Sequence, residues 1–117
     1  MSEKEFDVQG FARGIHVLLV LSTLQGGQKH GYQIARDIEA DSNGLFCFRH
    51  GTLYPILHRL EGEGMIRGAW SQDSGRRKKV YRLTGLGRRH LTGETGRVQE
   101  IVLRLMEFLP SPGEAPA

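Results

Sequence analysis

The sequence has little of what marks secreted, membrane-bound or disulfide-linked proteins. It contains a single cysteine, Cys47, so no disulfide can form within the chain, which is typical of proteins in a reducing cytoplasm. The longest apolar run, residues 15–21, is interrupted by a histidine and is far shorter than the roughly 20 residues that span a bilayer. Residues 1–7 are acidic, unlike a secretory signal. We therefore expect a cytoplasmic protein with no membrane segment.

The usual constellations of a catalytic or metal site are also missing. No Ser/His/Asp spacing, metal-ligand cluster or phosphate-binding glycine loop can be assembled. Cys47 and His50 have a C-x-x-H spacing, but no second cysteine or paired histidine completes a metal site. We favour a buried cysteine and a surface histidine over a metal centre. The sequence thus predicts neither an enzyme nor a bound cofactor.

The positive charge of the chain is concentrated in one half. At 117 residues, with 38% hydrophobic and 25% charged residues, the chain has the size and composition of one small globular domain. Its net charge is +3, yet residues 49–90 carry ten Lys/Arg against three Asp/Glu, and the remainder carries six against ten. Such clustering of cations indicates a phosphate-binding face.

The middle of the basic half predicts a short helix with two different faces. Threonine is a favourable N-cap, so we expect the helix to begin near Thr52, with Pro55 in its first turn and Gly62 and Gly64 at its end. The residues at helical spacing that need a core behind them are Leu53, Ile56, Leu57 and Leu60. The residues left for the other face and its flanks are Thr52, Tyr54, Pro55, His58 and Arg59.

A hairpin with a basic tip follows this helix. We expect strands at 67–72 and 79–83, a turn at 73–75, and Trp70 and Tyr81 as cross-strand or core aromatics. This order is typical of a winged helix-turn-helix, in which the helix enters the major groove of DNA and the hairpin, or wing, contacts the backbone. The alternatives are an ordinary amphipathic helix beside a hairpin, and a merely solvated basic run. The tip cations are Arg76, Arg77, Lys78 and Lys79.

Apolar periodicity predicts further helices over residues 8–24, 31–40 and 86–109, with a loop at 25–31, a short extended run at 45–48 and a disordered tail at 110–117. In a helix-turn-helix the N-terminus of the second helix meets the DNA backbone, so Tyr32 and Gln33 are candidate phosphate donors. Packing of Tyr32 under the recognition helix is the alternative.

The last predicted helix has an apolar seam but no obvious groove within so small a domain, which predicts a homodimer. Gly93 and Gly96 predict a bend in it or a close approach of another backbone. The interface residues expected from this helix and the first one are Phe11, Ile15, Leu91, Val98, Ile101, Val102, Leu105, Met106 and Leu109.

Several spaced motifs resemble the PadR family of bacterial transcriptional regulators, over about residues 8 to 108. The resemblance implies that the helix beginning near Thr52 is the recognition helix and that a small subfamily dimerises through one C-terminal helix packed with the first helix. It also implies repression that an effector releases. The motifs are Gly51-Thr52-Leu53-Tyr54-Pro55-Ile56-Leu57, Arg59-Leu60-Glu61, His30-Gly31-Tyr32-Gln33-Ile34, Gly64-Met65-Ile66, Trp70, Arg77-Lys78-Lys79-Val80-Tyr81-Arg82-Leu83-Thr84 and Gly87.

This chain departs from the family pattern in two places. Gln33 stands where relatives more often have glutamate, which removes a charge. Some relatives capture flat aromatic compounds between subunits with a tryptophan on the C-terminal helix, whereas the only tryptophan here is Trp70 on the predicted wing. A drug-stacking pore is therefore not expected, and the residues left to line an apolar interface cavity are Phe11, Met106 and Phe108.

The overall prediction is a mainly α fold with a small β-hairpin: a winged helix-turn-helix over residues 1–84, a C-terminal dimerisation helix over 85–109 and a tail over 110–117. We expect a bacterial repressor that binds a pseudo-palindromic duplex operator as a homodimer at the nucleoid and is released by a small-molecule effector. A winged helix that binds proteins instead of DNA is the alternative. The predicted DNA-binding residues are Tyr32, Gln33, Thr52, Tyr54, His58, Arg59, Arg76, Arg77, Lys78 and Lys79.

Overall fold

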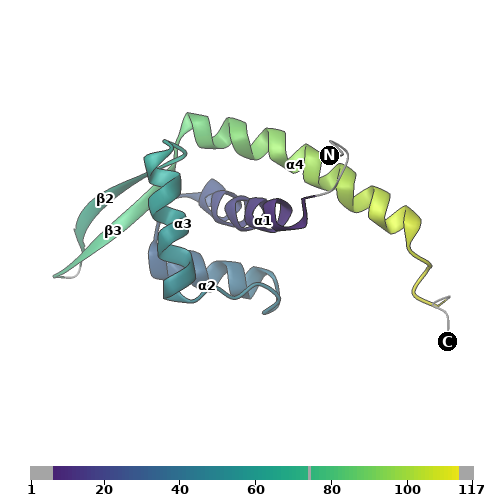
Figure 1. Ribbon diagram of the computed structural model, residues 1–117. Helices are drawn as coiled ribbons and strands as arrows, with labels where there is room; N and C mark the ends of the chain where they lie inside the picture. Colours follow the sequence, from purple (N-terminus) through teal and green to yellow (C-terminus); the bar gives the residue numbers. More distant parts are fainter. Residues whose placement is uncertain (1–6, 74, 114–117) are drawn as a thin grey trace.

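A computed structural model describes residues 7–73 and 75–113, and the predictions made for residues 1–6, Ser74 and 114–117 lie outside these ranges. The predicted winged helix-turn-helix with a long C-terminal helix is confirmed (Figure 1). In chain order the elements are α1 (Val8–Thr23), the 3-10 turn η1 (Leu24–Gly26), β1 (Lys29–His30), α2 (Gly31–Asp41), α3 (His50–Gly62), β2 (Ile66–Asp73), β3 (Arg76–Leu83) and α4 (Gly85–Phe108).

The sheet has three antiparallel strands in the order β1-β3-β2, one more than the sequence predicted. β2 and β3 form the wing, with Ile66 opposite Leu83 at its base and Trp70 opposite Lys79 further out. β1 pairs with β3 through Lys29 and His30 alone. Two residues are too few for an alternating pattern, and the surrounding glycines and polar residues made this stretch read as a loop.

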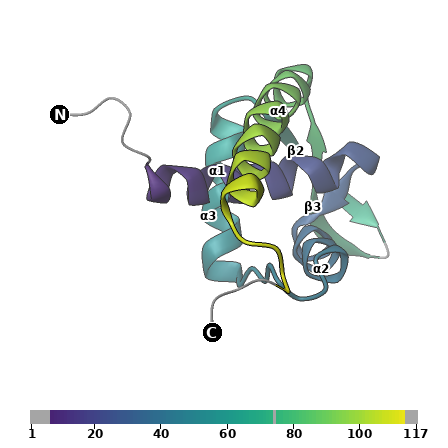
Figure 2. The same cartoon turned by 90° about the vertical axis from the view of Figure 1, so that its right-hand side faces the viewer.

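The hydrophobic core forms around α1, which lies between α4 and α2 and also contacts α3 (Figure 1). Figure 2 shows α4 crossing over α1. The helical spacing of the apolar residues explains this arrangement, because it places one stripe of each helix toward the same centre. The most buried side chains are Val20, Leu21, Leu24, Ile34, Leu53, Leu57, Leu60 and Ile66.

The helix predicted as the recognition helix begins earlier than expected. α3 starts at His50, and its N-cap is Arg49, whose carbonyl accepts hydrogen bonds from the backbone N–H groups of Thr52 (3.0 Å) and Leu53 (2.9 Å). Thr52 is therefore not the cap, and Pro55 lies inside the helix instead of in its first turn. Capping preference is a weak signal, and here a contact within the helix accompanies the earlier start, because the imidazole of His50 stacks on the ring of Tyr54, one turn later, with the ring centres 5.5 Å apart.

The connection between α2 and α3 is irregular, not the extended run predicted for residues 45–48. Ser42 holds it in place, because its hydroxyl donates to the Ile38 carbonyl (2.8 Å) and accepts from the Phe46 N–H (3.0 Å). Asn43 and Gly44 adopt left-handed φ angles of 52° and 81°, which turn the chain out of α2. Local polar contacts thus replace strand pairing in this segment.

α4 begins where Thr84 caps it, the Thr84 hydroxyl accepting from the Gly87 N–H (3.1 Å) and donating to the Gly64 carbonyl (2.6 Å). Gly87 lies so close to the start of β2 that a Cβ would stand 2.1 Å from the Met65 carbonyl oxygen. The predicted bend or close approach at residues 93 and 96 is not seen within the described protomer, since the helix is continuous there and nothing lies within 4 Å of either added Cβ.

Candidate nucleic-acid interface

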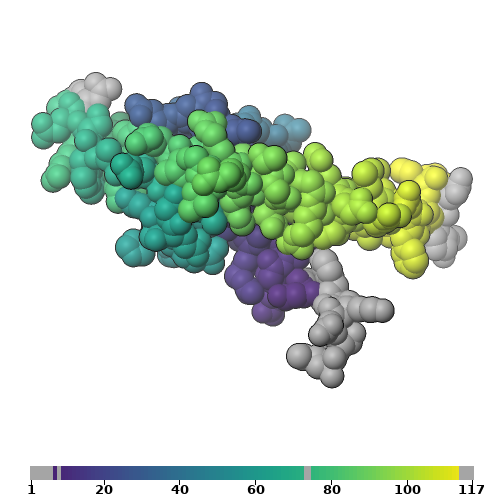
Figure 3. All heavy atoms as spheres, turned by 90° about the horizontal axis from the view of Figure 1, so that it is seen from above, coloured from purple at the N-terminus to yellow at the C-terminus, as the bar shows by residue number. Residues whose placement is uncertain are grey.

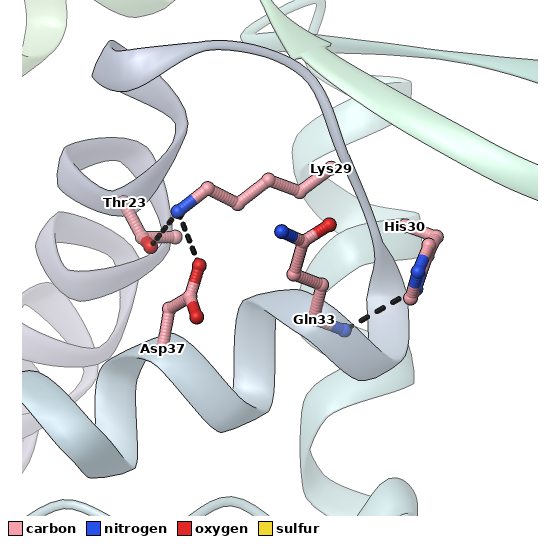
Figure 4. Close-up of polar contacts among 5 residues, drawn as sticks. All are labelled: Thr23, Lys29, His30, Gln33 and Asp37. Carbon is pink, nitrogen blue, oxygen red and sulfur yellow. Dashed lines mark hydrogen bonds and ion pairs between the residues drawn. The ribbon is translucent and has the colours of Figure 1, made fainter.

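The start of α2 is held by three polar contacts, drawn in Figure 4. His30 is the N-cap, and its Nδ1 accepts a hydrogen bond from the Gln33 N–H at 3.3 Å. Lys29 Nζ lies 2.5 Å from Asp37 Oδ2 and 3.1 Å from Thr23 Oγ1, which ties the strand before α2 to α1 and to α2 itself. These contacts fix the helix N-terminus, whose N–H groups favour an anion in front of them.

Tyr32 is on the surface and not under the recognition helix. The residue is 56% exposed, its ring stacks on that of His30 with the ring centres 6.5 Å apart, and the guanidinium of Arg36 lies 5.7 Å from the centre of the tyrosine ring. Gln33 beside it is also exposed. The packing alternative for Tyr32 is therefore wrong, and both side chains are available to a partner.

Tyr54, not Tyr32, is the tyrosine that packs between the start of α2 and α3. Its hydroxyl lies against Gly31 at the start of α2, where an added Cβ would stand 2.9 Å from the oxygen. Tyr54 as a whole is 42% exposed, on the flank of α3 that faces the wing. Tyr54 thus connects the N-terminus of α2 to the outward face of the recognition helix.

The outward face of α3 is narrow and carries small or polar residues. Helical spacing places Gly51, Pro55 and His58 along its centre, and all three are exposed. Thr52 and Arg59 lie on the flank away from the wing, where Arg59 Nε is 3.9 Å from Glu63 Oε2. Arg59 borders a hollow of about 510 Å³ that α1 and α4 also line. The structure therefore does not gather Arg59 with the wing cations.

The wing carries an exposed tryptophan. Trp70 is 59% exposed and lies opposite Lys79 on β3, so of its two predicted roles it has the cross-strand one and not the core one, whereas Tyr81 is buried. The guanidinium of Arg77 lies 4.7 Å from the centre of the Trp70 ring, within cation–π range. β3 also begins at Arg76, so the four tip cations are strand residues and alternate between the two faces of the wing. Arg76, Arg77 and Lys78 are exposed.

Lys79 differs from the other three cations because it is partly buried and ion-paired. Its Nζ donates to Glu61 Oε1 on α3 at 2.8 Å, and the Gly68 N–H on β2 donates to the other carboxylate oxygen at 3.2 Å. The hydrogen bond from Lys79, helped by that from Gly68, holds the pKa of Glu61 below its ordinary value. The same bond raises the pKa of Lys79 above its ordinary value.

These elements surround an open groove of about 560 Å³, here called the aromatic groove. Its residues come from the start of α2, from α3 and from the wing: His30, Gly31, Tyr32, Tyr54, Trp70, Arg76, Arg77, Lys78, Lys79 and Tyr81. Six of the predicted DNA-binding residues line it, and Gln33, Thr52, His58 and Arg59 do not.

The predicted DNA-binding residues did not include His30 and Trp70 of the aromatic groove or two exposed arginines on the other face of the wing. His30 was predicted to lie in a loop, and Trp70 was predicted as a cross-strand or core aromatic and not as a residue of the groove. The other face of the wing carries Arg67 and Arg82, which pair in register and are both exposed. The alternation of side chains along a strand could have identified Arg67 and Arg82, because it places them on the opposite face of the wing from Trp70 and Arg77.

The predicted dimerisation residues divide along α4. Leu91 is buried in the core of its own protomer, so its predicted place in the interface is wrong. Val98 and Ile101 are half-buried, as are Phe11 and Ile15 on α1, while Val102, Leu105, Met106 and Leu109 are exposed. Figure 3 shows the C-terminal part of α4 extending beyond the body of the molecule. The apolar seam is therefore open to solvent mainly in its last two turns.

Cys47 is exposed, not buried as predicted, and its Sγ lies 3.5 Å from Glu39 Oε1. The hydrogen bond with this carboxylate raises the pKa of the thiol. Among residues 7–73 and 75–113, no three His, Cys, Asp or Glu side chains gather as they do around a metal ion. Within the same ranges, no helix has the length and apolar character needed to cross a membrane.

The sequence matches the transcriptional regulator PadR-like family over residues 20–93. It is 30% identical over 96 residues to the transcriptional regulator Rv3488 of Mycobacterium tuberculosis, a match that covers 82% of this chain and 87% of that protein.

Solved structures give the same result. A PadR family transcription regulator from Clostridium difficile superposes with a TM-score of 0.72 at 30% identity, over 83% of this chain and all of that one. Bacillus subtilis PadR, solved in complex with operator DNA, gives a TM-score of 0.64 at 26% identity, over 69% of this chain and 46% of that one.

Proposed function

The chain belongs to the PadR-like family of transcriptional regulators, and we propose that it is a repressor that binds a pseudo-palindromic duplex operator as a homodimer. Family members are regulators and not enzymes. The observation that carries the proposal is the aromatic groove, where a helix N-terminus, the flank of a second helix and a basic wing converge on one hollow. Each of these features suits the phosphate backbone of DNA.

The proposed contacts follow from where each side chain lies. The outward face of α3, with His58 at its centre and Tyr54 and Thr52 on its flanks, enters the major groove and meets base edges. Arg59 extends from the flank away from the wing, where its donors suit a guanine edge or a phosphate. Tyr32 and Gln33 take the backbone phosphate in front of α2. Arg76, Arg77 and Lys78 hold the wing on the backbone without reading sequence.

The exposed apolar end of α4 supports the dimer. Leu105, Met106 and Leu109 are all more than half exposed, at 53%, 66% and 54%, and a contiguous apolar stripe of this kind on a helix normally has a partner. We propose that residues 1–84 are the DNA-binding unit, that residues 85–109 are the dimerisation helix, and that residues 110–117 are a tail. In the dimer, the dimerisation helix packs together with α1. A two-fold dimer presents two recognition helices to half-sites about one helical turn apart.

Repression follows when the operator overlaps a promoter, and an effector that favours a different dimer geometry releases the DNA. A winged helix that binds only proteins is the competing function. The distribution of charge favours DNA, because residues 49–90 carry ten Lys/Arg against three Asp/Glu and the exposed wing arginines belong to that segment. A protein-binding wing has no need of this excess.

Selection of binding sites from a randomised duplex pool at physiological salt tests the proposal, together with the solution mass of the protein. We expect a recovered sequence with two-fold symmetry and a mass of two chains. A folded dimer that enriches no duplex contradicts operator binding by the protein alone and favours the protein-interaction module. An enriched sequence without symmetry, bound by a monomer, contradicts the dimeric arrangement.

A further inference from the structure

Glu61 connects the recognition helix to both strands of the wing. It stands near the C-terminal end of α3, where Figure 1 shows that helix beside the base of β2 and β3. One carboxylate oxygen accepts from Lys79 Nζ on β3 at 2.8 Å, and the other accepts from the Gly68 N–H on β2 at 3.2 Å. A single side chain of the base-reading helix thus holds both strands of the backbone-contacting hairpin.

Gly68, Tyr81 and Trp70 surround the ion pair of Glu61 and Lys79 and leave space for it. An added Cβ at Gly68 would stand 2.4 Å from Lys79 Cε and 3.1 Å from a Glu61 oxygen, so the absence of a side chain at position 68 makes the room that the pair occupies. Lys79 Nζ also lies 5.5 Å from the centre of the Tyr81 ring and 6.0 Å from that of Trp70. The ammonium therefore lies beside a carboxylate and two aromatic rings, on the face of the wing that is turned toward α3, while the Lys79 side chain stays 30% exposed.

We propose that Glu61 and Lys79 are positioning residues for DNA recognition, which set the angle between the recognition helix and the wing. In this arrangement Lys79 is not one of the cations that touch phosphate. Its charge is neutralised by Glu61, while the neighbouring Arg77 and Lys78 remain exposed for the backbone. The inference rests on the proposed operator binding, since it names the device that lets the helix and the wing engage one duplex together.

The proposal and a direct phosphate role for Lys79 make opposite predictions for Glu61. If Glu61 were only an acidic neighbour of the DNA, replacing it with glutamine would remove a repulsive charge and raise affinity. If Glu61 sets the wing angle, Glu61→Gln lowers affinity because the wing no longer meets the backbone in register with α3. We expect Glu61→Gln and Lys79→Gln each to lower affinity by about ten-fold, with the double variant no weaker than either single one.

The measurement is affinity for the duplex recovered by selection, determined over a series of salt concentrations. Lys79→Gln should leave the slope of log K against log salt unchanged, whereas Arg77→Gln should reduce its magnitude by about 0.9. The exchanged pair, Glu61→Lys with Lys79→Glu, keeps the net charge and the ion pair with β3 but cannot accept from the Gly68 N–H, so it should recover only part of the affinity. Higher affinity for Glu61→Gln, or a reduced slope for Lys79→Gln, would overturn the proposal.

A second readout needs no DNA. Trp70 is the only tryptophan and lies on the wing, so its fluorescence anisotropy decay reports the motion of the wing relative to the body of the protein. Glu61→Gln should lower the residual anisotropy of Trp70, and Arg104→Ala on the polar side of α4 should not. Unchanged anisotropy contradicts a positioning role for Glu61 even if DNA binding is confirmed. Lowered anisotropy in a protein that binds no duplex would instead refute the proposed operator function and leave the contact as a structural one.

Discussion

Gly31 and Tyr54 are fitted to each other at the junction of α2 and the recognition helix. A Cβ at position 31 would stand 2.9 Å from the tyrosine hydroxyl, so this tyrosine can lie across the start of α2 only because residue 31 is glycine. The contact joins the helix that faces a phosphate to the helix that faces the bases. It therefore offers a way to disturb recognition without disturbing the core.

Gly31→Ala should separate stability from binding. Alanine is favoured over glycine in a helix by about 0.5–1 kcal/mol, which offsets the cost of moving the half-exposed Tyr54 side chain. We expect the free energy of unfolding to change by less than about 1 kcal/mol, while operator affinity falls several-fold as Tyr54 is displaced. Denaturant unfolding and duplex titration measure the two effects. The control is Gly93→Ala, which meets nothing within 4 Å and should leave affinity unchanged.

Arg77→Ala should weaken binding to every duplex sequence. Arg77 is exposed on the wing and supported by the Trp70 ring at 4.7 Å, a position suited to a phosphate and not to a base edge. Removing one phosphate contact should reduce the magnitude of the salt slope by about 0.9, with the ratio of operator to random-duplex affinity little changed. Arg104→Ala, which removes a cation from α4, is the matched control. A wild-type salt slope in the Arg77→Ala variant would exclude a contact between Arg77 and a phosphate.

Leu105→Glu should convert the dimer to monomers. Burying a leucine contributes about 1.5–3 kcal/mol, and a two-fold dimer loses this contribution once in each subunit. We therefore expect the dimer dissociation constant to rise by at least about a hundred-fold. Analytical ultracentrifugation reads the mass. Leu103→Glu is a stringent control because Leu103 is also exposed, at 60%, but lies off the predicted seam. If the Leu103 variant dissociates and the Leu105 variant does not, the seam has been assigned to the wrong face of α4.

The Glu61–Lys79 pair should make stability depend on acid pH. The pKa of Glu61 is lowered in the folded protein, so its contribution is fully present above the ordinary glutamate pKa of about 4.3 and is lost as pH falls through the lowered value. Glu61→Gln should therefore be less stable than the wild type near pH 7, and the difference should shrink below about pH 4. Urea unfolding at a series of pH values measures it. Glu100→Gln, on the exposed face of α4, controls for the loss of a carboxylate.

Trp70 should report DNA binding directly. It is the only tryptophan, it is 59% exposed, and it lines the aromatic groove that we assign to the DNA backbone. Binding of the selected duplex should alter its emission as the groove loses water, and Trp70→Phe should abolish that signal. Emission that stays constant through a titration already shown to saturate by another method would exclude this side of the wing from the interface.

The sequence was sufficient for the order of the four helices and the wing and for the general location of the site, although it missed β1. Leu53, Leu57 and Leu60 recur at helical spacing, and all three are buried in α3 as that spacing requires. The basic run 76–79 and the turn before it identified the wing. Such patterns are local, since they depend on residues a few positions apart, and a sequence states local relationships directly.

The structure alone decided how the side chains of the site are used. Lys79 looked equivalent to its three neighbours, and only the approach of α3 to the wing gave it Glu61, a partner 18 positions away, at 2.8 Å. Leu91 looked like part of an interface seam until α4 packed onto the body of the protein and buried it. For Trp70 the sequence left a cross-strand and a core position open, because which face of a strand is buried depends on the elements packed against it. The composition and periodicity of this chain determined a winged helix with a basic surface, and the long-range packing of α3, α4 and the sheet decided which residues remain free to bind.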